Sequence, residues 1–167
     1  MSLKRTSSTI VIGARIEESA ANTFTEEGVD LQLNPLDNEV FIVQSINLDV
    51  RSPDAIAGAD TSSVLTLTTT SQASLPSLSN SNTLARKELT IRASGFVDGG
   101  VGFTEAFGDS PPLTLEYIVN IFTNNFFIQV KGNNTAAMTG ACKVYGYRAK
   151  ADAATYAALV QSEVLSS

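Results

Sequence analysis

Two aspartates, Asp54 and Asp60, have the residue type and spacing that could hold a metal ion. They lie in the polar segment 52–60 (SPDAIAGAD), and carboxylate oxygens are ligands that calcium prefers. Their spacing does not match the ligand positions of an EF-hand loop. We therefore predict no metal site and interpret the segment as an ordinary polar loop. Asp54 and Asp60 remain the candidate ligands for the alternative in which a metal ion is bound.

The chain contains no histidine and a single cysteine, Cys142. The lack of histidine excludes Ser-His-Asp and Cys-His nucleophilic centres and the imidazole-bound metal of a cupin. One cysteine can form neither an intramolecular disulfide nor a zinc cluster, and we expect Cys142 to be a small buried hydrophobe. Pairs of carboxylates are present, but glycoside hydrolysis also needs a cleft, usually with aromatic platforms. We therefore predict a protein that is not an enzyme, has no catalytic residue and binds no cofactor.

Two tyrosines near the C-terminal end are candidates for contacts with another molecule. Tyr145 and Tyr147 share one face of a predicted strand with Lys143, and there they could stack on a sugar or a base. We favour the alternative, in which they pack against another copy of the chain or against the terminal helix.

Phe127 is a further interface candidate, because it falls on the polar face of the segment 126–131. An aromatic side chain on such a face is unfavourable unless something covers it. We expect another strand, the terminal helix or a neighbouring subunit to cover it. In this segment the residues predicted to be buried are Phe126, Ile128 and Val130, and those predicted to face outward with Phe127 are Gln129 and Lys131.

Alternating and β-branched patterns predict eight or nine strands that would position these residues. The start of segment 39–51 is apolar on both faces, which is typical of a central strand covered on both sides. Residues 17–28 and 71–85 are polar and are predicted to be loops. The last three strands are separated by short turns and are predicted to form a meander. The predicted strands are 9–16, 29–33, 39–51, 63–70, 87–96, 101–107, 113–122, 126–131 and 140–150.

Residues 151–167 differ from the rest of the chain, because they are rich in alanine and have a helical pattern. Asp152 can cap the N-terminus of this helix. An apolar stripe at helical spacing must dock on the chain's own sheet or on a neighbour. The interface candidates on this stripe are Tyr156, Leu159 and Val160, and Val164 extends it.

The strand pattern predicts an all-β antiparallel sandwich of eight or nine strands with one short C-terminal helix. We favour a jelly roll, because eight strands with long loops between some of them and one apolar face on each suit that fold. The chain shows no internal repeat, which argues against a propeller or solenoid. An immunoglobulin-like sandwich is the alternative, but it needs fewer residues and often buries a tryptophan, which this chain lacks. The predicted organisation is a flexible arm (1–8), a sandwich domain (9–150) and a helical tail (151–167).

The net charge of −6, from 17 acidic and 11 basic residues, argues against a chain that coats nucleic acid. We expect this charge to provide solubility and repulsion between copies. No apolar run has the length of a membrane span, and the apolar stretch near the N-terminus is too short for a secretory signal. We therefore expect the chain to be made and folded inside a cell.

With its polar start (MSLKRTSST), its strands and its closing strand and tail (GACKVYGYRAKADAATYAALVQ), the chain resembles viral single jelly-roll capsid proteins. The resemblance implies a non-enzymatic shell subunit that assembles through its loops and termini. Its partners would be copies of itself and other virion proteins, and it would be made in the host cytoplasm and located in the virion. The chain lacks the family's basic arm, so we expect no direct binding of nucleic acid. The alternatives are a lectin-like or receptor-binding sandwich module and a capsid decoration or tail protein.

Overall fold

The structure is a computed structural model that describes residues 3–95, 103–107, 119–121 and 124–165. Within these residues it contains ten β-strands, one α-helix and one 3₁₀ turn. The strands are β1 (Leu3–Arg5), β2 (Ile10–Glu17), β3 (Thr25–Asp30), β4 (Glu39–Val50), β5 (Thr61–Thr68), β6 (Thr83–Arg92), β7 (Phe103–Phe107), β8 (Val119–Ile121), β9 (Asn125–Asn133) and β10 (Thr139–Ala151). The helix is α1 (Ala153–Leu165), and the 3₁₀ turn is η1 (Pro35–Asp37).

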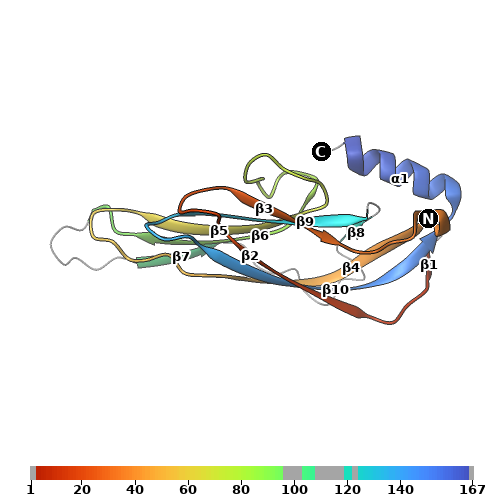
Figure 1. The fold of residues 1–167 in the computed structure, drawn as a ribbon, viewed down its shortest axis with the longest axis horizontal. Helices are drawn as coiled ribbons and strands as arrows, with labels where there is room; N and C mark the ends of the chain where they lie inside the picture. Colours follow the sequence, from red (N-terminus) through yellow and green to blue (C-terminus); the bar gives the residue numbers. More distant parts are fainter. Residues whose placement is uncertain (1–2, 96–102, 108–118, 122–123, 166–167) are drawn as a thin grey trace.

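The strands form two antiparallel sheets that face each other across a shared core (Figure 1). In sheet A, β1 and β2 pair with successive parts of one edge of β10, and β4 and β8 follow on its other side. In sheet B the order is β3-β9-β5-β6-β7. Apart from the additional strands β1 and β7, each sheet has four strands in the order of a jelly roll, and the chain repeatedly crosses between the sheets. The predicted all-β sandwich with one C-terminal helix is confirmed.

The predicted meander of the last three strands is wrong. β8 and β10 lie in sheet A, on opposite sides of β4, whereas β9 lies in sheet B between β3 and β5. An alternating pattern shows which face of a strand is buried. The pattern does not show which strand pairs with which. The prediction that consecutive strands pair therefore had no support from the alternation itself.

Two predicted boundaries near the N-terminus are also wrong. Leu3–Arg5, assigned to a flexible arm, form β1 and pair with residues 149–151 of β10. Residues 25–28, assigned to a loop, belong to β3, which ends before Gln32. Gln32 has a left-handed backbone (φ 53°) that cannot continue a strand. The alternating residues Leu31 and Leu33 are buried on either side of this turn.

The core lies between the inner faces of the two sheets and is filled by large apolar side chains. Phe126, Ile128 and Val130 are completely buried, as predicted, and face residues from β4. Cys142 is also in this core, and burial raises the pKa of its thiol to about 11, which confirms the predicted buried hydrophobe. Parts of three predicted strands lie outside the described residues, namely residue 96, residues 101–102 and most of segment 113–122.

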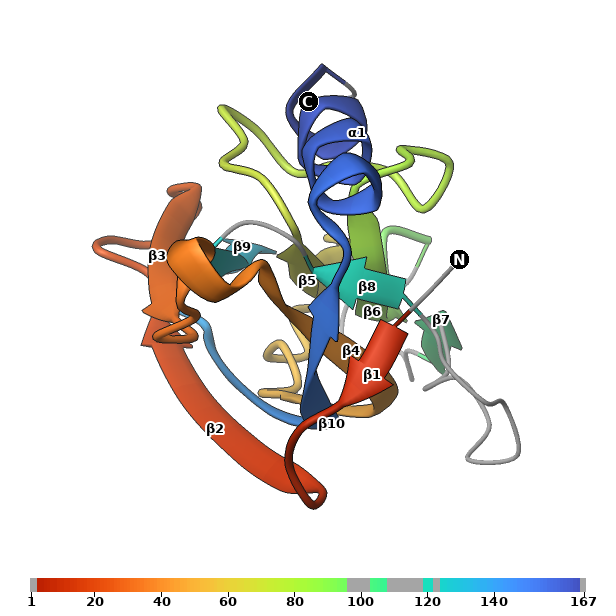
Figure 2. The same ribbon diagram turned by 90° about the vertical axis from the view of Figure 1, so that its right-hand side faces the viewer.

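A second, smaller apolar cluster lies on the outer face of sheet A, where α1 docks. Here β4 is buried on both faces, as predicted for a central strand. Figures 1 and 2 show α1 projecting from the end of the sandwich at which β10 ends and the N-terminus lies. The buried residues of this cluster are Val40, Ile42 and Ala149, and the helix residues packed on them are Tyr156, Leu159 and Val160.

Candidate functional site

The carboxylates of Asp54 and Asp60 are engaged with different segments of the chain rather than with a shared site. The Asp60 carboxylate accepts hydrogen bonds from the backbone N–H groups of Ser94 (3.0 Å) and Ala93 (2.9 Å), which hold its pKa below the ordinary value of 3.8. The Asp54 carboxylate accepts a bond from the side chain of Asn134 at 3.1 Å. Within the described ranges, no three acidic or cysteine side chains are grouped to hold a metal ion. These contacts give both aspartates a role in fastening loops.

Phe127 lies on the outer face of sheet B and is half-buried. Its cross-strand partner on β3 is Gly28, and a Cβ atom added to Gly28 would lie 3.3 Å from Cε1 of the phenylalanine ring. The ring therefore lies over the strand position that has no side chain of its own. Part of the ring stays accessible.

The prediction that Gln129 faces solvent is wrong. Its side chain is on the outer face of sheet B, but it is 0% exposed. Its Nε2 donates to Thr68 Oγ1 (2.7 Å) and to Glu26 Oε2 (2.8 Å), and its Oε1 accepts from the Thr66 hydroxyl (2.8 Å). The amide is thus satisfied by polar neighbours instead of water.

The segment 69–82 covers this face of sheet B and accounts for the burial of Gln129. The Ser71 hydroxyl and the Gln72 N–H bind the Glu26 carboxylate on β3, and the Pro76 carbonyl accepts a bond from Arg86 on β6. In Figure 1 the segment is the yellow-green loop drawn above β9 and β6. The long serine-rich loop predicted from the sequence is therefore held against its own sheet.

Tyr145 and Tyr147 share the outer face of sheet A with Lys143, as predicted, and both tyrosines are half-buried. The Arg5 guanidinium lies over the Tyr147 ring, 4.3 Å from its centroid, which is a cation–π contact within the chain. One face of Tyr147 is therefore already occupied by β1. Tyr145, which pairs with Val11 of β2, borders the open part of the sheet.

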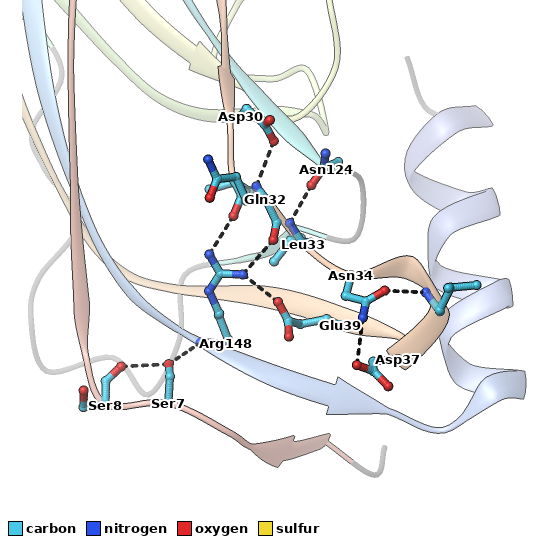
Figure 3. Close-up of polar contacts among 12 residues, drawn as sticks. Ser7, Ser8, Asp30, Gln32, Leu33, Asn34, Asp37, Glu39, Asn124 and Arg148 are labelled. Carbon is cyan, nitrogen blue, oxygen red and sulfur yellow. Dashed lines mark hydrogen bonds and ion pairs between the residues drawn. The ribbon is translucent and has the colours of Figure 1, made fainter.

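Arg148 anchors the end of β10 from which α1 continues (Figure 3). Its guanidinium donates to the carbonyls of Leu31 (2.9 Å) and Gln32 (2.9 Å) and to the Glu39 carboxylate (2.6 Å). The side chains of Arg148 and Glu39 are only 29% and 14% exposed. These bonds connect β10 to β4 and to the segment that follows β3. They fix the position of the strand end from which α1 continues.

The helix α1 exposes apolar surface on the side opposite the stripe that docks on sheet A. At 100° per residue, this opposite side carries small or apolar side chains and one glutamine, and all are exposed. Leu165, the largest apolar residue on this side, is 75% exposed. Ser162 also lies on this side and has an interaction partner. The other residues, called the free side, are Ala154, Ala157, Ala158, Gln161 and Leu165.

A hollow of about 700 Å³ lies on the outer face of sheet A, over β2, β10 and β4. The strand registers form two rows across it. In one row Gly13, Lys143 and Asn47 are neighbours, and in the other Arg15, Ala141 and Asp49 are neighbours. Small residues thus form the floor, while longer polar and charged side chains form the rim.

Sequence reasoning did not identify this hollow. The segment 10–17 places Gly13 and Arg15 on the outward face, which alternation alone can show. Their proximity to Lys143 depends on the pairing of β2 with β10, two strands far apart in the chain. No local pattern encodes that pairing.

Comparisons with known proteins add no family assignment: no family model matches the chain, and no curated protein matches it either. Over the part of the chain that the structure describes, no helix has the length and apolarity needed to cross a membrane.

Proposed function

We propose that this chain is a non-enzymatic shell subunit of a virus particle that assembles with copies of itself. The observation that carries the proposal is α1. Its docked side holds it on sheet A through Tyr156, Leu159 and Val160, and its opposite side exposes apolar surface. Burial of that surface between subunits would stabilise an assembly, because apolar area removed from water contributes about 25 cal/mol per Å².

The jelly-roll order of the sheets supports the same proposal, since this fold occurs in viral capsid proteins as well as in lectins and cupins. The fold by itself serves many functions. The absence of histidine from the sequence disfavours a metal-binding cupin, and the absence of tryptophan disfavours a lectin. The acidic charge supports contacts with protein, including other virion proteins, rather than with the genome.

The oligomeric state of the purified full chain tests this proposal. Light scattering after size exclusion, followed by negative-stain microscopy, is expected to show trimers, pentamers or closed shells of the 17.6 kDa chain. A protein that stays monomeric up to its solubility limit would refute the proposal. A monomer that also binds to a glycan array would identify a binding module instead.

A further inference from the structure

We infer that the free side of α1 packs into the hollow on sheet A of a second copy of this chain. This docking rests on the proposed self-assembly and specifies which two surfaces meet. The free side of α1 is defined by Ala154, Ala157, Ala158, Gln161 and Leu165. The hollow is defined by Gly13, Arg15, Asn47, Asp49, Ala141 and Lys143.

The shapes of the two surfaces match. Small side chains on the helix meet small residues on the floor of the hollow, so the helix axis can approach the sheet closely. A helix of 13 residues is about 20 Å long and about 10 Å wide, and it occupies roughly 1,500 Å³. The hollow of about 700 Å³ is therefore large enough to receive one side of the helix but not the whole helix. The other side stays on the helix's own sheet, because the docked and free sides are opposite.

The charges of the two surfaces are complementary. The C-terminal end of a helix carries about half a negative charge, and α1 has no basic residue in its last turn to offset it. Arg15 and Lys143 stand at the rim of the hollow and, within the described residues, make no ion pair or hydrogen bond. Arg51 lies beside them in an adjoining depression, so three basic side chains stand beside two carboxylates, Asp49 and the exposed Glu17. This local basic surface on an acidic chain suits the negative end of a neighbour's helix.

An apolar border continues the hollow toward Tyr145. Val11, the cross-strand neighbour of Tyr145 near the start of β2, is 52% exposed. In the docked arrangement the C-terminal end of the helix lies toward Arg15 and Arg51, so this border would cover residues of its first turns, such as Ala154 and Ala158. The same contact gives Tyr145 the interface role expected from the sequence.

Gly13 provides a substitution that fills the hollow without disturbing the subunit. A Cβ atom at Gly13 would meet only the Cys142 carbonyl oxygen, at an ordinary 3.8 Å. Gly13→Leu should therefore keep the fold of the monomer and block the helix of a second copy. The matched control is Gly95→Leu, because a Cβ at Gly95 has no atom within 4 Å. Sedimentation is expected to show at least tenfold weaker association for Gly13→Leu and unchanged association for Gly95→Leu.

If Gly13→Leu fails to fold, two charge-reversal variants test the docking instead. Lys143→Glu reverses the charge at the rim, whereas Lys131→Glu makes the same change on the outer face of sheet B. Only Lys143→Glu is expected to weaken association. If both hollow variants are folded and assemble as the wild type does, this docking is overturned while the proposed shell function stands. A monomeric wild type would instead overturn the proposed function.

Cross-linking between two single variants identifies the occupant directly. Ala157→Cys labels the free side of α1, and Asn47→Cys labels the hollow. The natural Cys142 does not interfere, because it is buried and its thiol pKa is about 11. A short bismaleimide is expected to give a heterodimer when the two variants are mixed, in excess of each variant alone. In the control, Ala157→Cys is mixed with Ser74→Cys, which lies on an exposed loop. A heterodimer yield no higher than in this control would contradict the docking.

Discussion

Replacing Arg148 with alanine should be among the most destabilising single changes at the helix-bearing end of the molecule. The substitution removes three hydrogen bonds, to Leu31, Gln32 and Glu39, and leaves the Glu39 carboxylate without its cation at 14% exposure. Breaking a buried ion pair from one side costs about 3–5 kcal/mol. Because Arg148 is partly accessible, we expect a loss of about 2–4 kcal/mol in the free energy of unfolding.

Lys150→Ala is the matched control for this prediction, because Lys150 lies two residues further along the same strand and pairs with Asp37. That pair is 3.4 Å apart, and its side chains are 46% and 49% exposed. An exposed pair of this kind contributes at most about 1 kcal/mol. The contrast between the two variants therefore isolates the effect of burial.

Urea unfolding followed by circular dichroism measures both losses. With a slope of about 2 kcal/mol per molar urea, Arg148→Ala should lower the midpoint by about 1–2 M and Lys150→Ala by less than about 0.5 M. Adding Glu39→Gln to Arg148→Ala should restore part of the loss, because it removes the unpaired charge. Equal effects of Arg148→Ala and Lys150→Ala would refute the reasoning.

Three further predictions concern groups elsewhere in the sandwich. Gln129→Leu should cost about 2–3 kcal/mol in urea unfolding, because it leaves the buried Thr66 hydroxyl without its acceptor and removes one bond each from Thr68 and Glu26; a loss below about 0.5 kcal/mol would contradict the role of this network. The lowered pKa of Asp60 means that its contribution to stability is present above pH 3.8 and is lost as the pH falls through the folded pKa. Asp60→Asn should therefore be less stable than the wild type at pH 6, and the difference should shrink in acid; a difference that grows in acid would have the wrong sign. Cys142 should react with a maleimide at pH 7 only after unfolding, since burial raises its thiol pKa to about 11, and rapid labelling of the folded chain would contradict that burial.

The sequence was sufficient to predict the fold class and the inner faces of several strands, because both depend on local alternation. Phe126, Ile128 and Val130 are spaced two residues apart, and that spacing alone places them on one buried face. The same alternation placed Gln129 on the opposite face, which is correct. Its burial was missed, because the segment 69–82 that covers it is distant in sequence and polar in composition.

The pairing of strands and the surfaces that depend on it were not predictable in this way. β8, β9 and β10 are consecutive, yet their neighbours are β4, β3, β5, β2 and β1. The hollow exists because Gly13 lies opposite Lys143 and Arg15 lies opposite Ala141 across β2 and β10, so it depends on contacts that only the folded chain creates. The terminal helix was predicted from its own periodicity, and the docked residues Tyr156, Leu159 and Val160 agree with the predicted stripe. Val164, which was predicted to extend the stripe, is 51% exposed.

Sedimentation velocity of the full chain beside a variant that lacks residues 153–167 tests the central claim most directly. We expect the full chain to form oligomers or shells as its concentration rises. The shortened chain should stay monomeric with the circular dichroism of a folded β-sandwich, because the main core does not include α1. Equal assembly of both chains, or a full chain that remains monomeric at every concentration, would contradict a shell subunit that assembles through its terminal helix.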